Sequence, residues 1–349
     1  MESSLSRRSL FQSAIALGLA AAQRARAQGI PENTGRSTVS LVKGDVRRKN
    51  ITDALAAIDH QILPVLRRKK YAVLKPNNVS TVNQLAATHA DALRGILDYL
   101  APRFQGPVFI AESSAGPTWE GFENFRYQQV ANEYRQVKLL DLNEEAKYEV
   151  VHVLDENLHI TPVRLAARLL DPDAYVICPA MLKTHNVTVA TLSVKNMTLG
   201  APLHQAPKES RHWNDKRKYH TGVRQTHYNM MVTAQKMAPF WGAAVIDGYE
   251  GMEGNGPSSG TPVPSRVAIA STDFVAADRV GVEAMGIDAS WLAYLQYCSE
   301  VGVGQYDLDR IEVRGETIEA VRKKYRMHGD IERELRWRGP MEEIPEKLG

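Results

Sequence analysis

Short apolar segments alternate with segments of helical periodicity along this chain, a pattern typical of an α/β fold. In residues 50–66, apolar side chains recur every three or four positions, as they do on one face of a helix. Residues 71–74 and 174–178 are short apolar runs, as expected for strands that are covered on both faces. We therefore predict a mostly parallel central sheet with helices on both faces. Polar loops at the strand ends should converge on one edge of this sheet.

The expected elements cover most of the chain. Thr88 is the expected N-cap of a helix that runs to residue 100, with Asp91 three positions later. The other expected helices cover residues 50–66, 228–237, 274–285 and 290–300. The expected strands cover residues 37–42, 71–74, 108–111, 137–140, 149–154, 174–178, 243–246 and 267–270.

Composition divides the chain into three parts. Residues 1–27 have the pattern of a signal peptide, residues 28–316 hold the α/β domain, and residues 317–349 form a charged tail that we expect to be helical. The least regular stretch of the domain is residues 201–225, which is rich in lysine, arginine and histidine. Its length and polarity predict a long surface loop, which either gates an anion site or is simply solvated.

The N-terminal segment carries the three parts of an export signal. Arg7 and Arg8 form a twin-arginine pair, and an apolar run follows at residues 11–22. This run is shorter than the roughly 20 apolar residues that span a bilayer. The Ala-Arg-Ala tripeptide at residues 25–27 then offers small residues for cleavage. We expect the twin-arginine machinery to export the chain to the periplasm or the extracellular space, with no membrane span in the mature chain. The alternative is an amphipathic surface helix.

Charge and cysteine content argue against several partners and cofactors. The first 27 residues hold four arginines and one glutamate, so the formal charge of +3 falls to zero in the remainder, with 39 basic and 39 acidic residues. A neutral chain gives no reason to expect a nucleic-acid partner. The two cysteines, Cys178 and Cys298, are too few to hold an iron–sulfur cluster with four thiolates, so we expect free thiols and no such cluster.

One cluster of polar residues lies downstream of the apolar run at residues 174–178. It begins with Lys183 and His185, and Lys195 and Asn196 follow ten residues after the histidine. Because imidazole titrates near neutral pH, we expect His185 to transfer a proton, with Lys183 as the second catalytic residue. The alternative for His185 is a side chain that is hydrogen-bonded to the backbone.

A second cluster follows the expected strand at residues 71–74. Its lysine can hold an anion such as a carboxylate or phosphate, and its amides can orient that anion without adding charge. At the edge of an open sheet, this cluster and the first one should meet. The expected substrate-binding residues are therefore Lys75, Asn77, Asn78, Lys195 and Asn196.

Acidic residues also follow several expected strands. Carboxylates are ligands that divalent cations prefer, so a divalent metal ion is one candidate cofactor. The segment at residues 248–260 is rich in glycine and forms either a ligand cradle or a long turn. It lacks the spacing of a phosphate-binding loop. The expected metal ligands are Glu112, Asp247, Glu253 and Asp273.

In combination, these motifs resemble the family called domain of unknown function 362. The resemblance spans roughly residues 70–290 and implies an α/β fold. The chain departs from the family pattern at Ala180, where relatives often have lysine. Some relatives carry a ferredoxin-like segment with cysteine clusters, which this chain lacks, so iron–sulfur chemistry is not implied. The matching residues are Lys75-Pro76-Asn77, Lys183-Thr184-His185, Lys195-Asn196, Gly200, Asp247-Gly248, Glu253 to Pro257, Gly260, Ser271, Asp273, Ala276 and Asp278.

Three hypotheses about function follow from these clusters. The first is an exported enzyme that acts on a small anionic substrate, with lysines for the anion, His185 for proton transfer and a metal ion on the acidic residues. The second is a periplasmic protein that binds a small molecule or cofactor without catalysis. The third is a purely structural role, in which the lysines pair with Glu112, Asp247 and Asp273 in the core.

Overall fold

The structure is a computed structural model that describes residues 35–206 and 208–339. The expected signal peptide at residues 1–27 lies outside the described residues.

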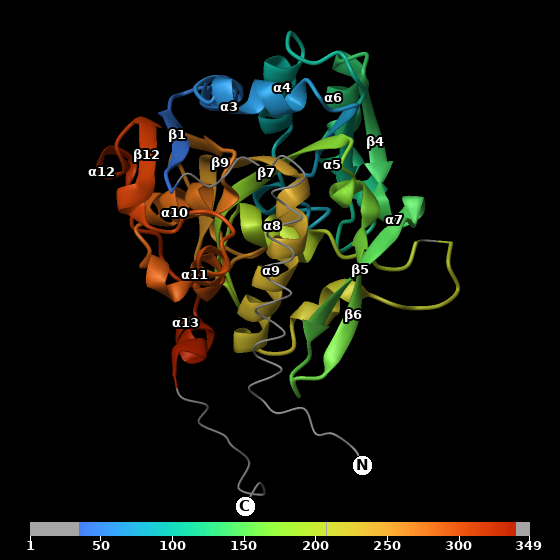
Figure 1. The fold of residues 1–349 in the computed structure, drawn as a ribbon, viewed down its shortest axis with the longest axis vertical. Coiled ribbons are helices and arrows are strands. Elements are labelled where there is room, and N and C mark those ends of the chain that lie inside the picture. The colour runs from blue at the N-terminus through green and yellow to red at the C-terminus, as the bar shows by residue number, and fades with distance from the viewer. Residues whose placement is uncertain (1–34, 207, 340–349) are drawn as a thin grey trace, which may run out of the picture.

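A ten-stranded sheet runs through the described part of the chain, in the order β12-β1-β11-β9-β7-β2-β3-β4 (Figure 1). Neighbouring strands along this path are parallel except at β11, which is antiparallel to both β1 and β9. The short strands β8 and β10 pair antiparallel with β7 and β9. The predicted α/β fold with mostly parallel strands is thus confirmed. The strands are β1 (Ser37–Lys43), β2 (Tyr71–Leu74), β3 (Val108–Glu112), β4 (Val137–Asp141), β7 (Ala174–His185), β8 (Val189–Thr191), β9 (Trp241–Glu253), β10 (Thr261–Val263), β11 (Val267–Ser271) and β12 (Ile311–Gly315).

Helices cover both faces of the sheet. Alternate residues of each strand point to opposite faces, and both faces carry apolar side chains that must be buried. In β2, Val73 packs into one core, whereas Ala72 and Leu74 pack into the other. The first core faces α8 (Ser193–Gly200), α9 (Val223–Met237), α10 (Phe274–Ala284) and α11 (Ala293–Glu300). The second core faces α2 (Arg47–Ala56), α3 (Asp59–Leu66), α4 (Ala90–Leu100), α5 (Thr118–Asn124) and α6 (Tyr127–Glu133).

Two details of the helices on the second face differ from expectation. The helix expected over residues 50–66 is divided into α2 and α3, because Ile58 leaves the helical conformation, with φ −114° and ψ 18°, while its side chain stays buried. The N-cap of α4 is His89, whose side chain accepts a hydrogen bond from the Asp91 amide. Thr88 instead accepts from the Asn77 amide and donates to the Pro179 carbonyl, so it joins β2 to β7.

A second sheet of two antiparallel strands, β5 (Tyr148–Leu154) and β6 (Ile160–Ala166), stands beside the main one. The strand expected at residues 149–154 is β5. Val151 and Val153 are buried whereas His152 between them is exposed, which is the pattern of a sheet with one solvated face. Between β4 and β5 the chain also forms the short helix α7 (Leu142–Glu145).

Two central strands run further than their apolar segments predict. β7 contains twelve residues and all are buried, so Lys183 and His185 lie on the strand itself and not in a loop after it. β9 contains thirteen residues and includes Asp247 and Glu253. The glycine-rich segment is therefore the end of β9 and its turn into β10, which supports the long-turn interpretation.

The reversed direction of β11 moves one predicted metal ligand away from the others. Asp273 follows β11, but the end of an antiparallel strand lies at the opposite edge of the sheet from the ends of β2, β3 and β7. There Asp273 is the N-cap of α10 and accepts hydrogen bonds from the amides of Val275 and Ala276. Its second oxygen accepts from the Ser37 hydroxyl and the Gln305 amide. The convergence predicted for Asp273 is therefore wrong.

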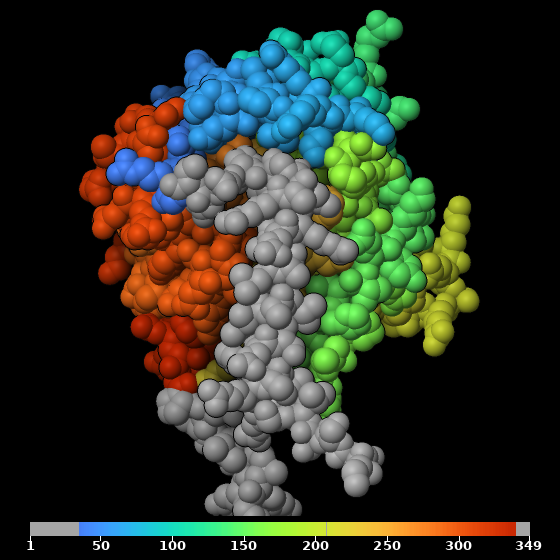
Figure 2. All heavy atoms as spheres, viewed as in Figure 1, coloured from blue at the N-terminus to red at the C-terminus, as the bar shows by residue number. Residues whose placement is uncertain are grey.

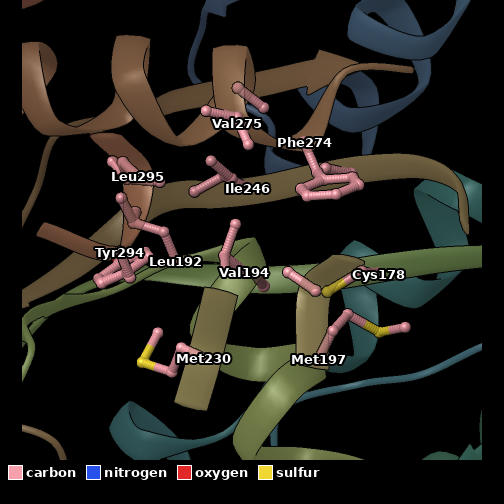
Figure 3. Close-up of a cluster of buried hydrophobic side chains, with 14 of the residues drawn as sticks. Cys178, Leu192, Val194, Met197, Met230, Ile246, Phe274, Val275, Tyr294 and Leu295 are labelled. Atoms are coloured by element: carbon pink, nitrogen blue, oxygen red, sulfur yellow. The ribbon is translucent and has the colours of Figure 1, made fainter. Parts of the chain in front are cut away.

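The helices α8 to α11 share a large apolar core with β7 and β9. Figure 3 shows side chains from these elements gathered in one cluster, among them Cys178, Val194, Met197, Met230 and Ile246. Both cysteines are buried free thiols, as expected. The core holds α8 firmly against β7, which matters because α8 also carries two predicted binding residues.

The segment after residue 316 is only partly helical and is built into the domain. Its described part contains the short helices α12 (Ile318–Val321) and α13 (Ile331–Glu334), with non-helical chain between them. Tyr325 is buried, and the buried Glu334 carboxylate accepts a hydrogen bond from the Val189 amide. The expected charged helical tail is therefore a strap across the ends of β7 to β10 over its described residues.

We predict that Asp273→Ala lowers the free energy of unfolding by about 1–2 kcal/mol, because it removes the N-cap of α10. Urea unfolding would measure this loss. Glu319→Ala, at an exposed position in α12, is the control and should change stability by less than about 0.5 kcal/mol. Unchanged stability in Asp273→Ala, together with weaker binding of a divalent metal, would instead support the metal-ligand interpretation.

Candidate functional site

A pocket of about 50 Å³ lies where β2 and β3 end. It occupies a switch point of the sheet, because the chain leaves β2 toward α4 on one face and leaves β7, through β8, toward α8 on the other. Crevices at such points are common ligand sites in open α/β sheets. The residues around the pocket include Lys75, Asn77, Asn78, Glu112, Ser113, Lys195, Asn196, Gly200 and Lys216.

All five predicted substrate-binding residues line this pocket, but Lys75 has a different role from the one expected. Its Nζ donates to Glu112 Oε2 at 2.8 Å, to Asn196 Oδ1 at 3.1 Å and to the Pro76 carbonyl at 2.8 Å. An ammonium group has three donors, so none remains for a ligand. This pairing agrees with the structural hypothesis for Lys75 and Glu112. Lys75 therefore positions Glu112 and Asn196.

Gly200 allows Lys75 to take this position. A Cβ atom at residue 200 would lie 2.8 Å from Lys75 Cε, closer than side chains approach one another. The glycine that follows the Lys-Asn motif is thus needed because a buried lysine passes over it.

The three asparagines form an amide layer beside the ion pair. Asn77 Nδ2 donates to Asn196 Oδ1 at 3.0 Å, and Asn196 Nδ2 lies 3.2 Å from Cys178 Sγ. Asn78 Oδ1 accepts from the Tyr127 hydroxyl at 3.0 Å. Asn77 Oδ1 and Asn78 Nδ2 are buried without a hydrogen-bond partner among the described residues. Because an unmade buried hydrogen bond is costly, these two atoms indicate where a ligand or water would bind.

Lys195 is placed by α8, which is fixed at both its side and its end. The carboxylate of Asp278, on α10, accepts from the amides of Ser193 and Val194 at 2.8 and 2.9 Å. Burial raises the pKa of Asp278 to about 7, although these hydrogen bonds oppose the rise. Asp278, the last of the residues that match the family pattern, therefore holds the N-terminus of the helix that carries Lys195.

Of the three lysines around the pocket, Lys195 is the one whose amine has no partner in the part of the chain that the structure describes. It is 6% exposed, and no hydrogen bond or ion pair joins its Nζ to another described residue. Burial, together with the positive charge of Lys75, lowers the pKa of Lys195 to about 7, although Glu112 opposes the shift. The neutral form of the Lys195 amine is therefore accessible near neutral pH.

Lys216 completes the pocket and is not among the site residues that the sequence predicts. It lies in a short 3₁₀ helix (Asp215–Tyr219), which is anchored by the ion pair of the buried Asp215 with Arg164 at 2.8 Å. Lys216 Nζ donates to the Gly200 carbonyl at 2.7 Å and to Ser113 Oγ at 3.1 Å. Burial lowers the pKa of Lys216 to about 7; Glu112 opposes this shift, and Lys75 and Lys195 add to it.

The sequence signal for Lys216 was its place in the basic stretch at residues 201–225. That signal could not separate it from the other basic residues nearby. Residues 208–212 are exposed and project at the right edge of Figure 2, whereas Lys216 turns back into the pocket.

Neither predicted catalytic residue lines the pocket. Lys183 is fully buried and donates to the carbonyls of Ala86 and Pro257 at 3.0 and 3.2 Å. His185 Nδ1 accepts from the amides of Val187 and Thr188, at 3.1 and 3.3 Å. Burial holds the pKa of both groups well below their ordinary values. Because β7 continues past Cys178, Lys183 and His185 lie on the strand and form hydrogen bonds with backbone groups. For His185 this is the alternative stated above, a side chain that is hydrogen-bonded to the backbone.

The four predicted metal ligands are not brought together. Glu112 lines the pocket, while Asp247 pairs with Arg47 at 3.2 Å and Glu253 accepts from the Arg326 amide. Asp273 caps α10 at the other edge. In residues 35–206 and 208–339, no three histidine, cysteine or acidic side chains are arranged to hold a metal ion.

A larger, open cleft of about 490 Å³ lies beside the C-terminal end of α10. Its arginines, Arg279 and Arg322, both pair with Glu283. Their charges are thus already compensated, so this cleft is a weaker candidate for an anion site than the small pocket.

Fold and pocket together define an α/β protein with a small basic pocket at the switch point of its sheet. The chain belongs to the family described as "Domain of unknown function (DUF362)", whose profile matches residues 72–283. The family resemblance that the sequence motifs predicted is thus confirmed. Every pocket residue described above lies within the matched segment.

Comparison with solved structures finds a crystal structure of a protein from Thermotoga maritima, with 12% sequence identity and a TM-score of 0.43. The similarity covers 75% of this chain and 60% of that protein, so this chain spans about three fifths of its length. No curated protein matches the chain. Within the described residues, no helix is long and apolar enough to cross a membrane.

We predict that Lys195→Met stabilises the protein at low pH. Below pH 7 the folded protein must bury the Lys195 ammonium, and this penalty disappears as pH rises toward the unfolded pKa of 10.5. The gain in unfolding free energy should be on the order of 1–3 kcal/mol at pH 6 and smaller at pH 9.

Urea unfolding at both pH values would measure this difference. The exposed Lys324→Met is the control and should change stability by less than about 0.5 kcal/mol at either pH. A loss of stability in Lys195→Met that is the same at pH 6 and pH 9 would contradict the lowered pKa.

Proposed function

We propose that this protein is an exported enzyme that binds a small anionic substrate in the pocket between Lys195 and Lys216. The observation that carries the proposal is the charge balance of the pocket. Lys195 and Lys216 both have pKa values lowered to about 7, and Glu112, the carboxylate beside them, is already paired with Lys75. A bound anion would supply the missing negative charge.

The size of the pocket limits the substrate. A volume of about 50 Å³ admits a ligand of a few non-hydrogen atoms, or the end of a larger one. Asn77 Oδ1 and Asn78 Nδ2, which have no hydrogen-bond partner among the described residues, offer one acceptor and one donor on side chains that line the same pocket. A small carboxylate with a second polar group matches this arrangement of charge and hydrogen-bonding atoms.

Catalysis is favoured by the same amines. Perturbed pKa values near the working pH are typical of groups that transfer protons or attack a substrate. With Lys183 and His185 outside the pocket, Lys195 and Lys216 replace them as the proposed catalytic pair. A binding protein without catalysis is the alternative, because the same charge balance also serves simple anion capture.

Anion binding is predicted to need both pocket lysines and to weaken as pH rises. Calorimetric titration with glycolate and with inorganic phosphate should show affinity at pH 6 that falls at least about tenfold at pH 8.5, where few amines of pKa 7 remain protonated. Lys195→Met and Lys216→Met should each weaken binding, and Lys324→Met should not. Equal affinity in all four proteins would refute the pocket as the anion site.

Turnover separates the enzyme from the binding protein. The full chain would be incubated with a mixture of small organic acids, and mass spectrometry would follow each acid. Consumption of one acid by the wild type, but not by Lys195→Met, supports the enzyme. Binding without consumption of any acid supports the alternative.

Export is predicted to depend on the arginine pair. The variant with Arg7→Lys and Arg8→Lys should remain in the cytoplasm as unprocessed chain, whereas the wild type should be recovered in the periplasm or medium in a shortened form. Cell fractionation and intact-mass measurement decide this. Equal distribution of the two proteins would contradict twin-arginine export.

A further inference from the structure

We propose that Lys195 Nζ is a nucleophile that forms an imine with the carbonyl carbon of a small oxo acid, while Lys216 holds its carboxylate. This inference rests on the anion-binding function proposed above. It adds a covalent role for one amine and the carbonyl class of the substrate.

Geometry separates Lys195 from the other buried lysines. Lys75 uses all three donors on Glu112, Asn196 and Pro76, and Lys183 is bound to two carbonyls outside the pocket. Lys195 Nζ has no partner among the described residues, although it lines the pocket. It is therefore the amine whose lone pair can face a ligand.

The position of Lys195 on α8 supports attack at a defined point. The helix is held by Asp278 at its N-terminus and by Val194 and Met197 in the core (Figure 3). Such support limits the movement of a catalytic side chain and keeps its reacting atom near the bound substrate.

Lys195 can attack the carbonyl while Lys216 binds the carboxylate, because the surroundings of the two amines differ. Lys216 Nζ donates to the Gly200 carbonyl and to Ser113 Oγ, and both acceptors favour its ammonium form. Among the residues that the structure describes, no such acceptor holds a proton on Lys195. Because the charge on Lys195 lowers the pKa of Lys216, the two amines disfavour double protonation. The state with a charged Lys216 and a neutral Lys195 is the one that binds a carboxylate and attacks a carbonyl.

The chemical step balances without any cofactor. The lone pair of Lys195 Nζ forms the C–N bond as the carbonyl π bond breaks, and the resulting carbinolamine then loses water. The carbonyl oxygen leaves with both hydrogens of the amine, which leaves a C=N bond to Lys195. A lysine that is desolvated beside another cation is a known means of raising the fraction of nucleophilic amine at neutral pH.

Reductive trapping tests this inference. The full chain would be incubated with glyoxylate or pyruvate, treated with sodium borohydride, digested and mapped by mass spectrometry. The expected result is an adduct on Lys195, formed at least about tenfold faster than on the exposed Lys324. Its rate should be highest near pH 7, where a neutral Lys195 and a charged Lys216 coexist, and lower at pH 5 and pH 9.

Matched controls make the result specific. Lys195→Met should lose the pocket adduct, and Lys324→Met should keep it. Glycolate, a carboxylate of similar size without a carbonyl, should bind but leave no adduct. Lys216→Met should slow trapping severalfold at low oxo-acid concentration, since the carboxylate loses its cation.

Two failures are distinguishable. Binding of glycolate without any Lys195 adduct from either oxo acid overturns the imine and leaves the anion site standing. Adducts spread equally over surface lysines overturn it as well. If neither binding nor an adduct is found, the proposed function falls together with this inference.

Discussion

The buried ion pair between Lys75 and Glu112 is the interaction on which the pocket depends. It joins the ends of two neighbouring parallel strands, and through Asn196 it reaches α8 on the other face of the sheet. A buried charge that loses its partner costs roughly 3–5 kcal/mol, so neither residue can be changed alone without disturbing the other. The ion pair therefore has a fixed position, and the other polar groups of the pocket are arranged around it.

Around this ion pair, the pocket holds more amines than carboxylates. Burial in a medium of low dielectric constant disfavours charge, and the positive charge of Lys75 disfavours it further at Lys195. The fold thus accepts a local cost in stability that a purely structural core would avoid. Such conflicts between stability and local chemistry are typical of functional sites.

The sequence predicted the layers of the fold and most of one wall of the site. Strand-end polar residues at Lys75, Asn77 and Asn78 do meet Lys195 and Asn196, because parallel strands bring their ends to one edge. The same argument failed for Asp273, since apolar runs in parallel and antiparallel strands look alike. It also failed for His185, because no apolar pattern shows that β7 continues through polar residues.

By itself, the sequence determined the alternation of strands and helices, the family motifs and the residue types available at the sheet edge. These follow from local periodicity and from residues that are close in the chain. Tertiary structure alone decided that all three donors of Lys75 are used, that Lys195 has no partner in the described part of the chain, and that Lys216 joins them from a distant segment. Hydrogen-bond saturation and pKa depend on which groups share a buried volume, and that is set by packing between elements rather than by order along the chain.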